Sequence, residues 1–171
     1  MPADNSASTF WLLIDWGDTL MRDDSSADGP MVFWPQVEAV SGAVEVLTGL
    51  RSKWRLALAT NADASDEPQI RAALKRVYLD QLIERIYCFR KIGHKKPSPE
   101  YFSFVVKDLG VPVDQIVMVG DSFDVDITGA NQMGIRAIWL NERSDEIRSG
   151  ERHRTIRKLV ELPQVLEEFI C

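Results

Sequence analysis

Short apolar segments alternate with segments of helical periodicity along this 171-residue chain, and this alternation restricts the fold more than any other feature. Apolar runs of about 4–8 residues bounded by turn signals are typical of strands buried in a parallel sheet. Strands that alternate with helices build a parallel sheet with helices on both faces. We therefore predict an α/β fold with one five-stranded sheet. The predicted strands are residues 10–15, 55–60, 85–89, 116–120 and 135–140.

The segments between these strands have helical spacing and recognisable ends. The clearest predicted helix has Ser98 as its N-cap, Pro99 in its first turn and Gly110 after its last apolar residue. The other predicted helices are residues 44–54 after a Ser41 cap, 68–77, 125–133 before Gly134, and two helices within 145–170 separated at Pro163.

The length of the chain falls within the one-domain range of about 100–200 residues. We predict a single domain over residues 1–171, with its core at about 10–140 and C-terminal helices at about 145–170. An irregular flap, residues 21–40, follows the first strand. It is too short to be a domain of its own, because below about 40 residues a core needs metals or disulfides. No separate cap domain is expected.

Charge and cysteine content exclude several classes of protein. The 20 Lys+Arg and 26 Asp+Glu residues give a net charge of −6, so the surface repels polyanions and nucleic acid is not an expected partner. Cys88 and Cys171 are too few for a disulfide framework and are expected to be free thiols, with Cys88 in the core. The apolar run at residues 10–14 is too short to span a membrane and lacks a basic leader. We expect a soluble cytoplasmic protein with no membrane partner.

Four polar clusters lie at the ends of the predicted strands or in the loops beyond them. Open parallel sheets bind their ligands at this edge. Each cluster alone is a weak signal, but all four in this order form a specific combination. The clusters are Asp15-Trp16-Gly17-Asp18-Thr19-Leu20, Thr60-Asn61, Lys95-Lys96-Pro97 and Gly120-Asp121-Ser122-Phe123-Asp124-Val125-Asp126.

This ordered set resembles the four motifs of the haloacid dehalogenase-like (HAD) hydrolase superfamily, over about residues 10–140. The resemblance implies a Rossmann-like sheet with strand order 3-2-1-4-5 and a capless, phosphatase-like member of the superfamily. Strands one and four would then be neighbours. Asp15 and Asp121 would meet at their carboxyl ends.

The same resemblance implies a magnesium-dependent phosphohydrolase that forms an aspartyl-phosphate on Asp15. Mg²⁺ is a hard ion that binds carboxylates, waters and substrate oxygens, and it would offset the repulsion between a carboxylate nucleophile and an anionic phosphate. The implied metal ligands are Asp15, Asp121, the main-chain carbonyl of Gly17 and, through water, Asp126.

A phosphorylated substrate, either a small molecule or a macromolecule, is the implied partner. Lys96 would place a positive charge beside Asp15 and the phosphate. The Thr60 hydroxyl and backbone donors near Asn61 would bind phosphoryl oxygens. Of the two adjacent lysines, Lys96 matches the family motif because it precedes Pro97.

One position departs from the family pattern. Phosphatases of this superfamily usually carry a second Asp two residues after the nucleophile, where it protonates the leaving oxygen, and here that residue is Gly17. Asp18 comes one residue later, and near-extended backbone points residues i and i+3 to opposite sides. Two hypotheses follow: a slow or selective phosphohydrolase, and a catalytically weak or inactive phosphate-binding module whose flap serves a protein partner.

Other features have simpler structural interpretations. Asp124 is expected to cap the helix after the fourth strand rather than bind metal. A run of basic residues is expected to form a solvated helix face rather than an anion site. The basic residues are Arg148, Arg152, His153, Arg154, Arg157 and Lys158.

Little covers the end of a capless sheet, so we expect either a bulky substrate or a homo-oligomer that closes the site. Phe33 and Trp34 in the flap are candidates for that contact, and the alternative is that they pack on the core of their own chain.

Overall fold

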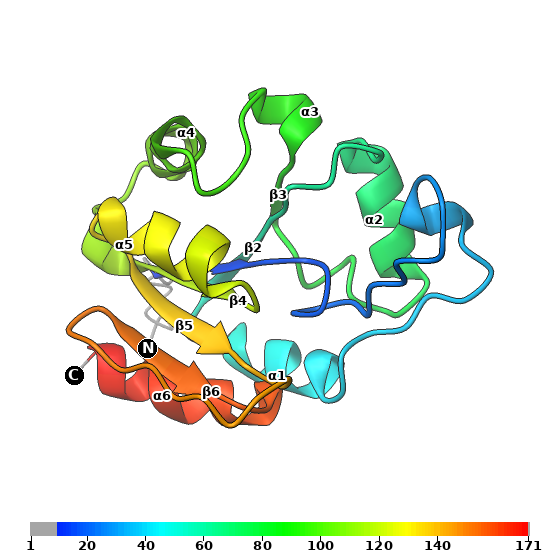
Figure 1. Cartoon of the computed structure of the whole chain (residues 1–171). Coiled ribbons are helices and arrows are strands. Elements are labelled where there is room, and N and C mark those ends of the chain that lie inside the picture. Colours follow the sequence, from blue (N-terminus) through cyan, green and yellow to red (C-terminus); the bar gives the residue numbers. More distant parts are fainter. Residues whose placement is uncertain (1–9, 171) are drawn as a thin grey trace, which may run out of the picture.

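The computed structural model describes residues 10–170 and contains a parallel sheet with strand order β3-β2-β1-β4-β5-β6 (Figure 1). Neighbouring strands are parallel throughout. All five predicted strands are present in the predicted order, so the Rossmann-like α/β class is confirmed, and β6 adds an edge strand. The strands are β1 (Trp11–Ile14), β2 (Arg55–Ala59), β3 (Arg85–Tyr87), β4 (Ile116–Gly120), β5 (Arg136–Leu140) and β6 (His153–Ile156).

Helices follow most strands, and the helix predicted after Ser98 is confirmed. The Ser98 hydroxyl accepts a hydrogen bond from the backbone N–H of Tyr101, and Gly110 ends the helix with a φ of 68°. The helices are α1 (Ala43–Leu50), α2 (Glu67–Lys75), α3 (Phe89–Ile92), α4 (Pro99–Leu109), α5 (Gly129–Gln132) and α6 (Leu162–Ile170), with a π-helical turn (Phe123–Thr128) before α5 and 3₁₀ turns at Met31–Phe33, Val113–Gln115 and Leu159–Glu161.

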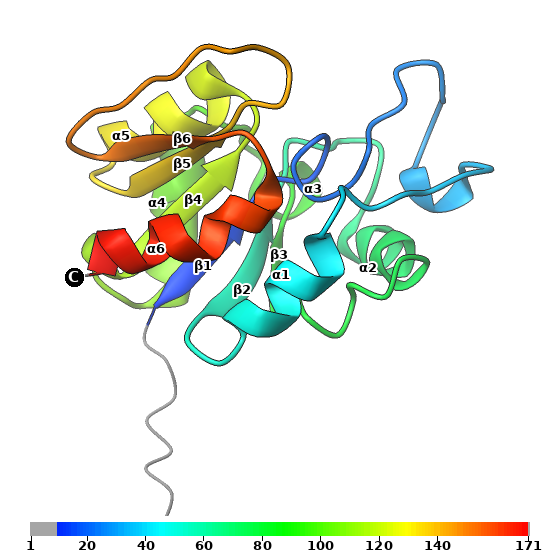
Figure 2. The same cartoon turned by 90° about the horizontal axis from the view of Figure 1, so that it is seen from below.

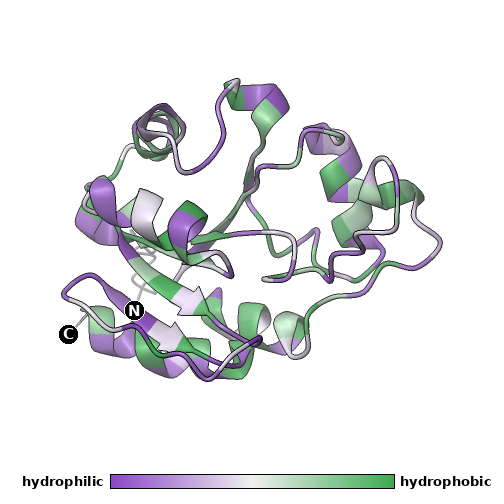
Figure 3. Ribbon diagram, viewed as in Figure 1, coloured by the Kyte–Doolittle hydropathy of each residue, from purple (hydrophilic) through white to green (hydrophobic). Residues whose placement is uncertain are grey.

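Side chains of the central strands alternate between two hydrophobic cores. Leu12 and Ile14 pack with residues of α1, α2 and α6, whereas Trp11 and Leu13 pack with residues of α4 on the opposite face. Figure 2 shows α1 and α6 in front of the sheet and α4 and α5 behind it. Figure 3 shows both hydrophobic and polar residues on the helices, as expected for helices that pack one side against a sheet. Burial on both faces explains why β1 and β4 are continuous apolar runs.

The prediction of two C-terminal helices is wrong. Residues 153–156 form strand β6, whose register pairs Ile138 with Arg154, and only α6 follows it. The polar side chains of β6 are tolerated because this strand is at the edge of the sheet and is only half-buried. Pro163 does not separate two helices, because it is the second residue of α6, where a missing backbone N–H costs no intrahelical bond.

Two predicted helix caps are also wrong. The residue that precedes α1 is Gly42, with a φ of 80°, and not Ser41. Before the π-helical turn, the hydroxyl of Ser122 accepts from the backbone N–H of Val125, so Ser122 caps this segment in place of Asp124. In both cases the cap lies one or two residues from the predicted position.

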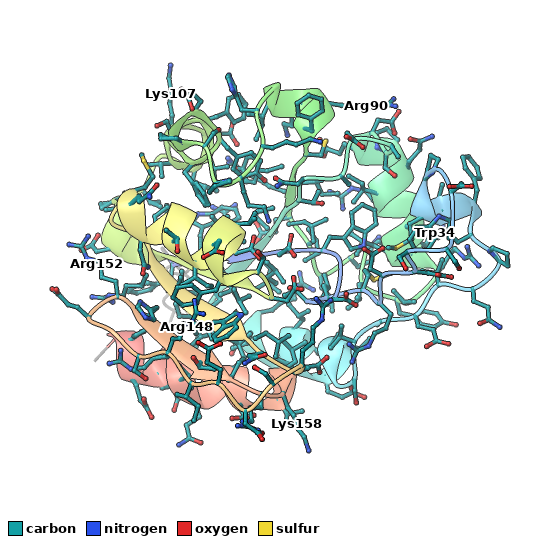
Figure 4. The ribbon with its side chains drawn as sticks, in the orientation of Figure 1. Trp34, Arg90, Lys107, Arg148, Arg152 and Lys158 are labelled. Atoms are coloured by element: carbon teal, nitrogen blue, oxygen red, sulfur yellow. The ribbon has the colours of Figure 1, made fainter. Side chains whose placement is uncertain are left out.

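The basic C-terminal run does not form a helix face. Its residues lie in the loop after β5, in β6 and just beyond β6. The guanidinium of Arg148 lies over the rings of Phe123 and Trp139, at 4.2 and 5.2 Å from the ring centroids. Figure 4 shows Arg148, Arg152 and Lys158 on the β5–β6 side of the molecule, away from Trp34.

The flap is anchored at its base and against α2. Val40 donates its backbone N–H to Leu20, and Met21 bridges to Ala39. At the end of α2, the guanidinium of Arg76 donates to the backbone carbonyls of the flap residues Val32, Trp34 and Pro35. Both Figure 1 and Figure 2 show the flap beside α2 at one side of the sheet.

The structure tests the predictions for the cysteines and for membrane spans only over the residues that it describes. Cys88 is buried and free, as predicted, although it precedes α3 rather than lying in a strand. Cys171 lies outside the described residues. Among residues 10–170, no helix is long and apolar enough to cross a membrane.

Candidate active site

Asp15 and Asp121 are brought together by the pairing of β1 with β4. Ile14 lies opposite Val119, so the residues that follow each strand end at the same edge of the sheet. The backbone N–H of Asp15 continues the ladder by donating to the Val119 carbonyl at 2.9 Å. The predicted meeting of the two carboxylates at the central strands therefore follows from the strand order.

Lys96 is the buried cation of this cluster. Its side chain is only 1% exposed, and its ammonium lies 2.7 Å from Asp15 Oδ1, 2.7 Å from Asp126 Oδ1 and 2.6 Å from the carbonyl oxygen of Ala59. All three protons of the ammonium therefore have acceptors, which a buried lysine requires. The neighbouring Lys95 pairs with Asp63 at the surface instead.

The side chain of Asn61 positions the loop that carries Lys96. Its amide donates to the Lys96 carbonyl at 2.8 Å and accepts from the Lys96 N–H at 2.7 Å. Thr60, at the end of β2, accepts from the backbone N–H of Ala62 at 3.0 Å, and its own proton has no acceptor within residues 10–170. Thr60 therefore keeps a donor, whereas the amide of Asn61 is committed to the protein.

Asp126 fits only because residue 120 is glycine. A Cβ on Gly120 would lie 2.1 Å from Asp126 Oδ2, a distance that no real side chain tolerates. Asp126 is 1% exposed, and its second oxygen accepts from the backbone N–H of Ser122. Asp126 is thus a fully bonded buried carboxylate behind the cavity.

Ionisation of the cluster is strongly perturbed. Burial and the charge of Asp15 raise the pKa of Asp121 to about 7. Burial also raises the pKa of Asp126 to about 6, although Lys96 acts in the opposite direction. Burial alone would lower the pKa of Lys96, but the carboxylates of Asp126 and Asp15 outweigh it and raise the pKa above its usual value. The carboxylates therefore hold more negative charge than one lysine balances.

The donor set of the cluster fits a magnesium ion. Asp15, Asp121 and Asp126 each offer an oxygen within 4.8 Å of the others. The Thr19 hydroxyl lies 3.4 Å from Asp15 Oδ2 and 3.3 Å from Asp121 Oδ1 and so links these two carboxylates. Mg²⁺ prefers such hard oxygen ligands and binds through one or two carboxylates plus waters and substrate oxygens.

A cavity of about 430 Å³ lies at this edge of the sheet, next to the flap. Its lining includes Asp15, Thr60 and Asp121 from the strand ends, and Met31 and Trp34 from the flap. Figure 4 shows Trp34 on the flap side of the molecule. The indole N–H of Trp34 donates to the carbonyl of Gly29, which fixes this part of the flap. The cavity has the size of a small-molecule site.

Asp18 is not available to replace the acid missing at position 17. Its carboxylate pairs with Arg143 and accepts the backbone N–H of Asp23. Arg143 also lies 3.7 Å from Asp121 and is 73% exposed at the mouth of the cavity. Neither Thr19 nor Arg143 was predicted as a site residue. Thr19 belongs to the first motif and could have been considered, whereas Arg143 lies in a loop with no local signal.

The fold is that of a Rossmann-like α/β protein, and the candidate site lies at the carboxyl ends of adjacent central strands, where open sheets of this class bind their ligands. The chain belongs to the haloacid dehalogenase-like hydrolase family. The family model described as haloacid dehalogenase-like hydrolase matches residues 29–140. That range holds Thr60, Lys96, Asp121 and Asp126, while Asp15 precedes it.

Similar proteins include enzymes and structures of this family. The chain is 32% identical to N-acylneuraminate-9-phosphatase of Mus musculus over 134 residues, which cover 74% of this chain and 51% of that enzyme. A HAD phosphatase structure from Thermococcus onnurineus is 28% identical with a TM-score of 0.65, and the match covers 76% of this chain and 59% of that chain. The chain spans about half the length of the curated relatives that it matches.

An uncharacterised protein from Listeria monocytogenes serotype 4b has the same fold over nearly its full length. The TM-score is 0.83 at 24% identity, and the match covers 94% of this chain and 98% of that chain. At this identity the likeness shows the fold alone.

Proposed function

We propose that this protein is a magnesium-dependent phosphohydrolase that acts through an aspartyl-phosphate on Asp15. The observation that carries the proposal is the position of Asp15. One of its oxygens is held by buried Lys96, and the residue lines the cavity beside Asp121. Phosphatases among the similar proteins support the reaction class. The substrate is a phosphate monoester, and the cavity volume favours a small metabolite.

In the first step, a carboxylate oxygen of Asp15 attacks phosphorus and the bond to the leaving oxygen breaks. Lys96 fixes the orientation of the nucleophile and balances its charge, while the free hydroxyl proton of Thr60 binds a phosphoryl oxygen. Asn61 acts by holding the Lys96 loop, and backbone donors beside it complete the phosphate contacts. In the second step, water attacks phosphorus and releases phosphate and the free Asp15 carboxylate.

Asp15, Asp121 and the carbonyl of Gly17 would hold Mg²⁺ directly. Asp126 would act through water, because its oxygens already bind Lys96 and the Ser122 N–H. When bound, the ion supplies positive charge that lowers the repulsion between the incoming phosphate and the carboxylates.

Residues 10–170 form one sheet-centred unit without a cap, and we propose that the chain works as a single domain. Closure of the site by a second copy or by a bulky substrate stays a prediction, and a small metabolite as substrate leaves the second copy as the means of closure; Phe33, which is 72% exposed on the flap, is available for that contact.

The test of the proposed function is hydrolysis of para-nitrophenyl phosphate. We expect turnover with Mg²⁺ and its loss on chelation with EDTA, restored by added Mg²⁺. An acidic phenol leaves without much protonation, so this substrate does not depend on a strong acid catalyst. Absence of turnover with and without the metal would favour the phosphate-binding module over the enzyme.

Asp121→Asn is expected to abolish stabilisation by Mg²⁺ while stabilising the metal-free protein at pH 8. The pKa of Asp121 is about 7 in the folded state, above the ordinary value of 3.8, so its ionisation costs stability as the pH rises through about 7. Asparagine removes that cost.

For the wild type, the increase in Tm caused by Mg²⁺ should be larger at pH 8 than at pH 6, because protons compete with the ion below about pH 7.

These Tm values are measured by thermal unfolding with Mg²⁺ and with EDTA. At a 100-fold excess over its Kd, a ligand stabilises the folded state by about 2.7 kcal/mol, which is readily detected. Asp124→Asn is the matched control, because Asp124 is exposed in the same segment and lies outside the carboxylate cluster. A Mg²⁺-dependent Tm shift that survives in Asp121→Asn would contradict the assigned ligand role.

A further inference from the structure

The cavity of the proposed phosphohydrolase lacks an obvious proton donor for the leaving oxygen. Alkyl phosphates release a strongly basic alkoxide, so their hydrolysis gains about 10²–10⁴-fold from a positioned acid–base group. Residue 17, two positions after the nucleophile, is a glycine and carries no such group. Another side chain must therefore supply the proton if the protein acts on alkyl phosphates.

Five aspartates line the cavity, and four of them are already engaged. Asp15 binds Lys96, and Asp121 hydrogen-bonds Thr19. Asp18 pairs with Arg143, and Asp63 pairs with Lys95 at the rim. The fifth is Asp23, whose carboxylate has no hydrogen bond or ion pair within residues 10–170. The five are Asp15, Asp18, Asp23, Asp63 and Asp121.

Asp23 occupies the space beside the missing side chain of Gly17. A Cβ built on Gly17 would lie 3.5 Å from the Cβ, Cγ and Oδ2 atoms of Asp23, an ordinary van der Waals distance. Gly17 is two residues from Asp15, which limits their separation along the chain to about 7 Å. Asp15, Gly17 and Asp23 also line the same cavity, so the exposed carboxylate of Asp23 lies on the side of that cavity into which a side chain at position 17 would project.

The backbone of Asp23 is held in this place at the start of the flap. Its N–H donates to Asp18 Oδ1 at 3.2 Å, and the preceding residue, Arg22, donates its N–H to the Glu38 carbonyl at 2.8 Å. Met21 bridges to Gly17 on one side and to Ala39 on the other. The contact between Asp23 and Gly17 thus depends on the folded flap base rather than on a free loop.

We propose that Asp23 is the acid–base catalyst of the reaction, in the place that Gly17 leaves open. This inference rests on the proposed function. As Asp15 attacks phosphorus and the bond to the leaving oxygen breaks, the carboxylic acid of Asp23 gives its proton to that oxygen, and the alcohol departs. The resulting carboxylate takes a proton from the water that attacks the aspartyl-phosphate. Hydrolysis frees Asp15 and phosphate and returns Asp23 to its acid form.

The test compares Asp23→Asn with the wild type on a series of phosphate monoesters whose leaving groups range from para-nitrophenol to a simple alkanol. We expect kcat/KM to fall by about 10²–10⁴-fold for the alkyl phosphate and by less than about 10-fold for para-nitrophenyl phosphate. Asp28→Asn is the matched control, because Asp28 is exposed on the same flap and does not line the cavity. A structural role for Asp23 would lower activity on every substrate alike.

A second variant moves the carboxylate back to position 17. The φ of Gly17 is not in the left-handed region, and a Cβ there would make only ordinary van der Waals contacts with Asp23 at 3.5 Å, so the backbone tolerates Gly17→Asp. In the Asp23→Asn background, Gly17→Asp should restore at least about 10-fold of the lost activity on alkyl phosphates, whereas alone it should add little.

The outcomes separate the two proposals. Turnover that requires Asp15 but shows the same leaving-group dependence in Asp23→Asn and in the wild type would overturn the role of Asp23 and leave the proposed function intact. Absence of any Asp15-dependent turnover would overturn both. Loss of turnover limited to poor leaving groups, with rescue from position 17, would establish Asp23 as the acid–base catalyst.

Discussion

Asp15→Asn is expected to lower kcat/KM for para-nitrophenyl phosphate by about 10⁴–10⁶-fold, the range observed when members of a covalent catalytic unit are removed. The amide cannot attack phosphorus, so no aspartyl-phosphate can form. It also removes one of the carboxylates that surround the proposed cation. The side-chain volume hardly changes, and the variant should fold.

The measurement combines steady-state rates with acid-quenched labelling by a substrate that carries radioactive phosphate. The wild-type protein should become labelled on a hydroxylamine-sensitive acyl phosphate, and Asp15→Asn should not. Asp28→Asn, which makes the same chemical change on the flap, should keep both the rate and the label. Turnover in Asp15→Asn within 10-fold of the wild type would show that another group is the nucleophile.

The central sheet could be predicted because its inner strands are buried on both faces, and their sequences are therefore continuous apolar runs. β1 and β4 contain no charged residue, and the polar residues that follow them mark the carboxyl edge. β6 carries no such pattern. Its segment His153–Ile156 is polar at three positions, and only its pairing with β5 makes it a strand.

The residues of the candidate site also differ in whether the local sequence singles them out. Asp15, Asp121 and Lys96 each lie in a short motif beside a strand end or turn, and local sequence is enough to single them out. Asp23 has no local signal, because its relation to the cavity depends on the flap base that folds it against Gly17. The sequence predicts that backbone donors near Asn61 bind the phosphate, but it does not predict the role of the Asn61 side chain, whose two hydrogen bonds join it to Lys96, 35 residues away in sequence.

Lys96→Met is expected to cause the largest loss of stability among the variants considered. The lysine is the common partner of Asp15, Asp126 and the Ala59 carbonyl, and its removal leaves Asp126 as a buried carboxylate without a cation. Removing one partner of a buried ion pair costs about 3–5 kcal/mol. That is a large part of the 5–15 kcal/mol by which domains are stable.

Each kcal/mol corresponds to about 2–4 °C in Tm for a chain of this size, so Tm should fall by about 10 °C when measured in EDTA. Lys95→Met is the matched control: its pair with Asp63 is exposed, and such pairs contribute less than about 1 kcal/mol. Adding Asp126→Asn to Lys96→Met should recover part of the loss, because it removes one of the unpaired buried charges. If Lys96→Met is as stable as Lys95→Met, the buried ion pairs do not stabilise the fold, and the position of Lys96 must be explained by its contact with the nucleophile alone.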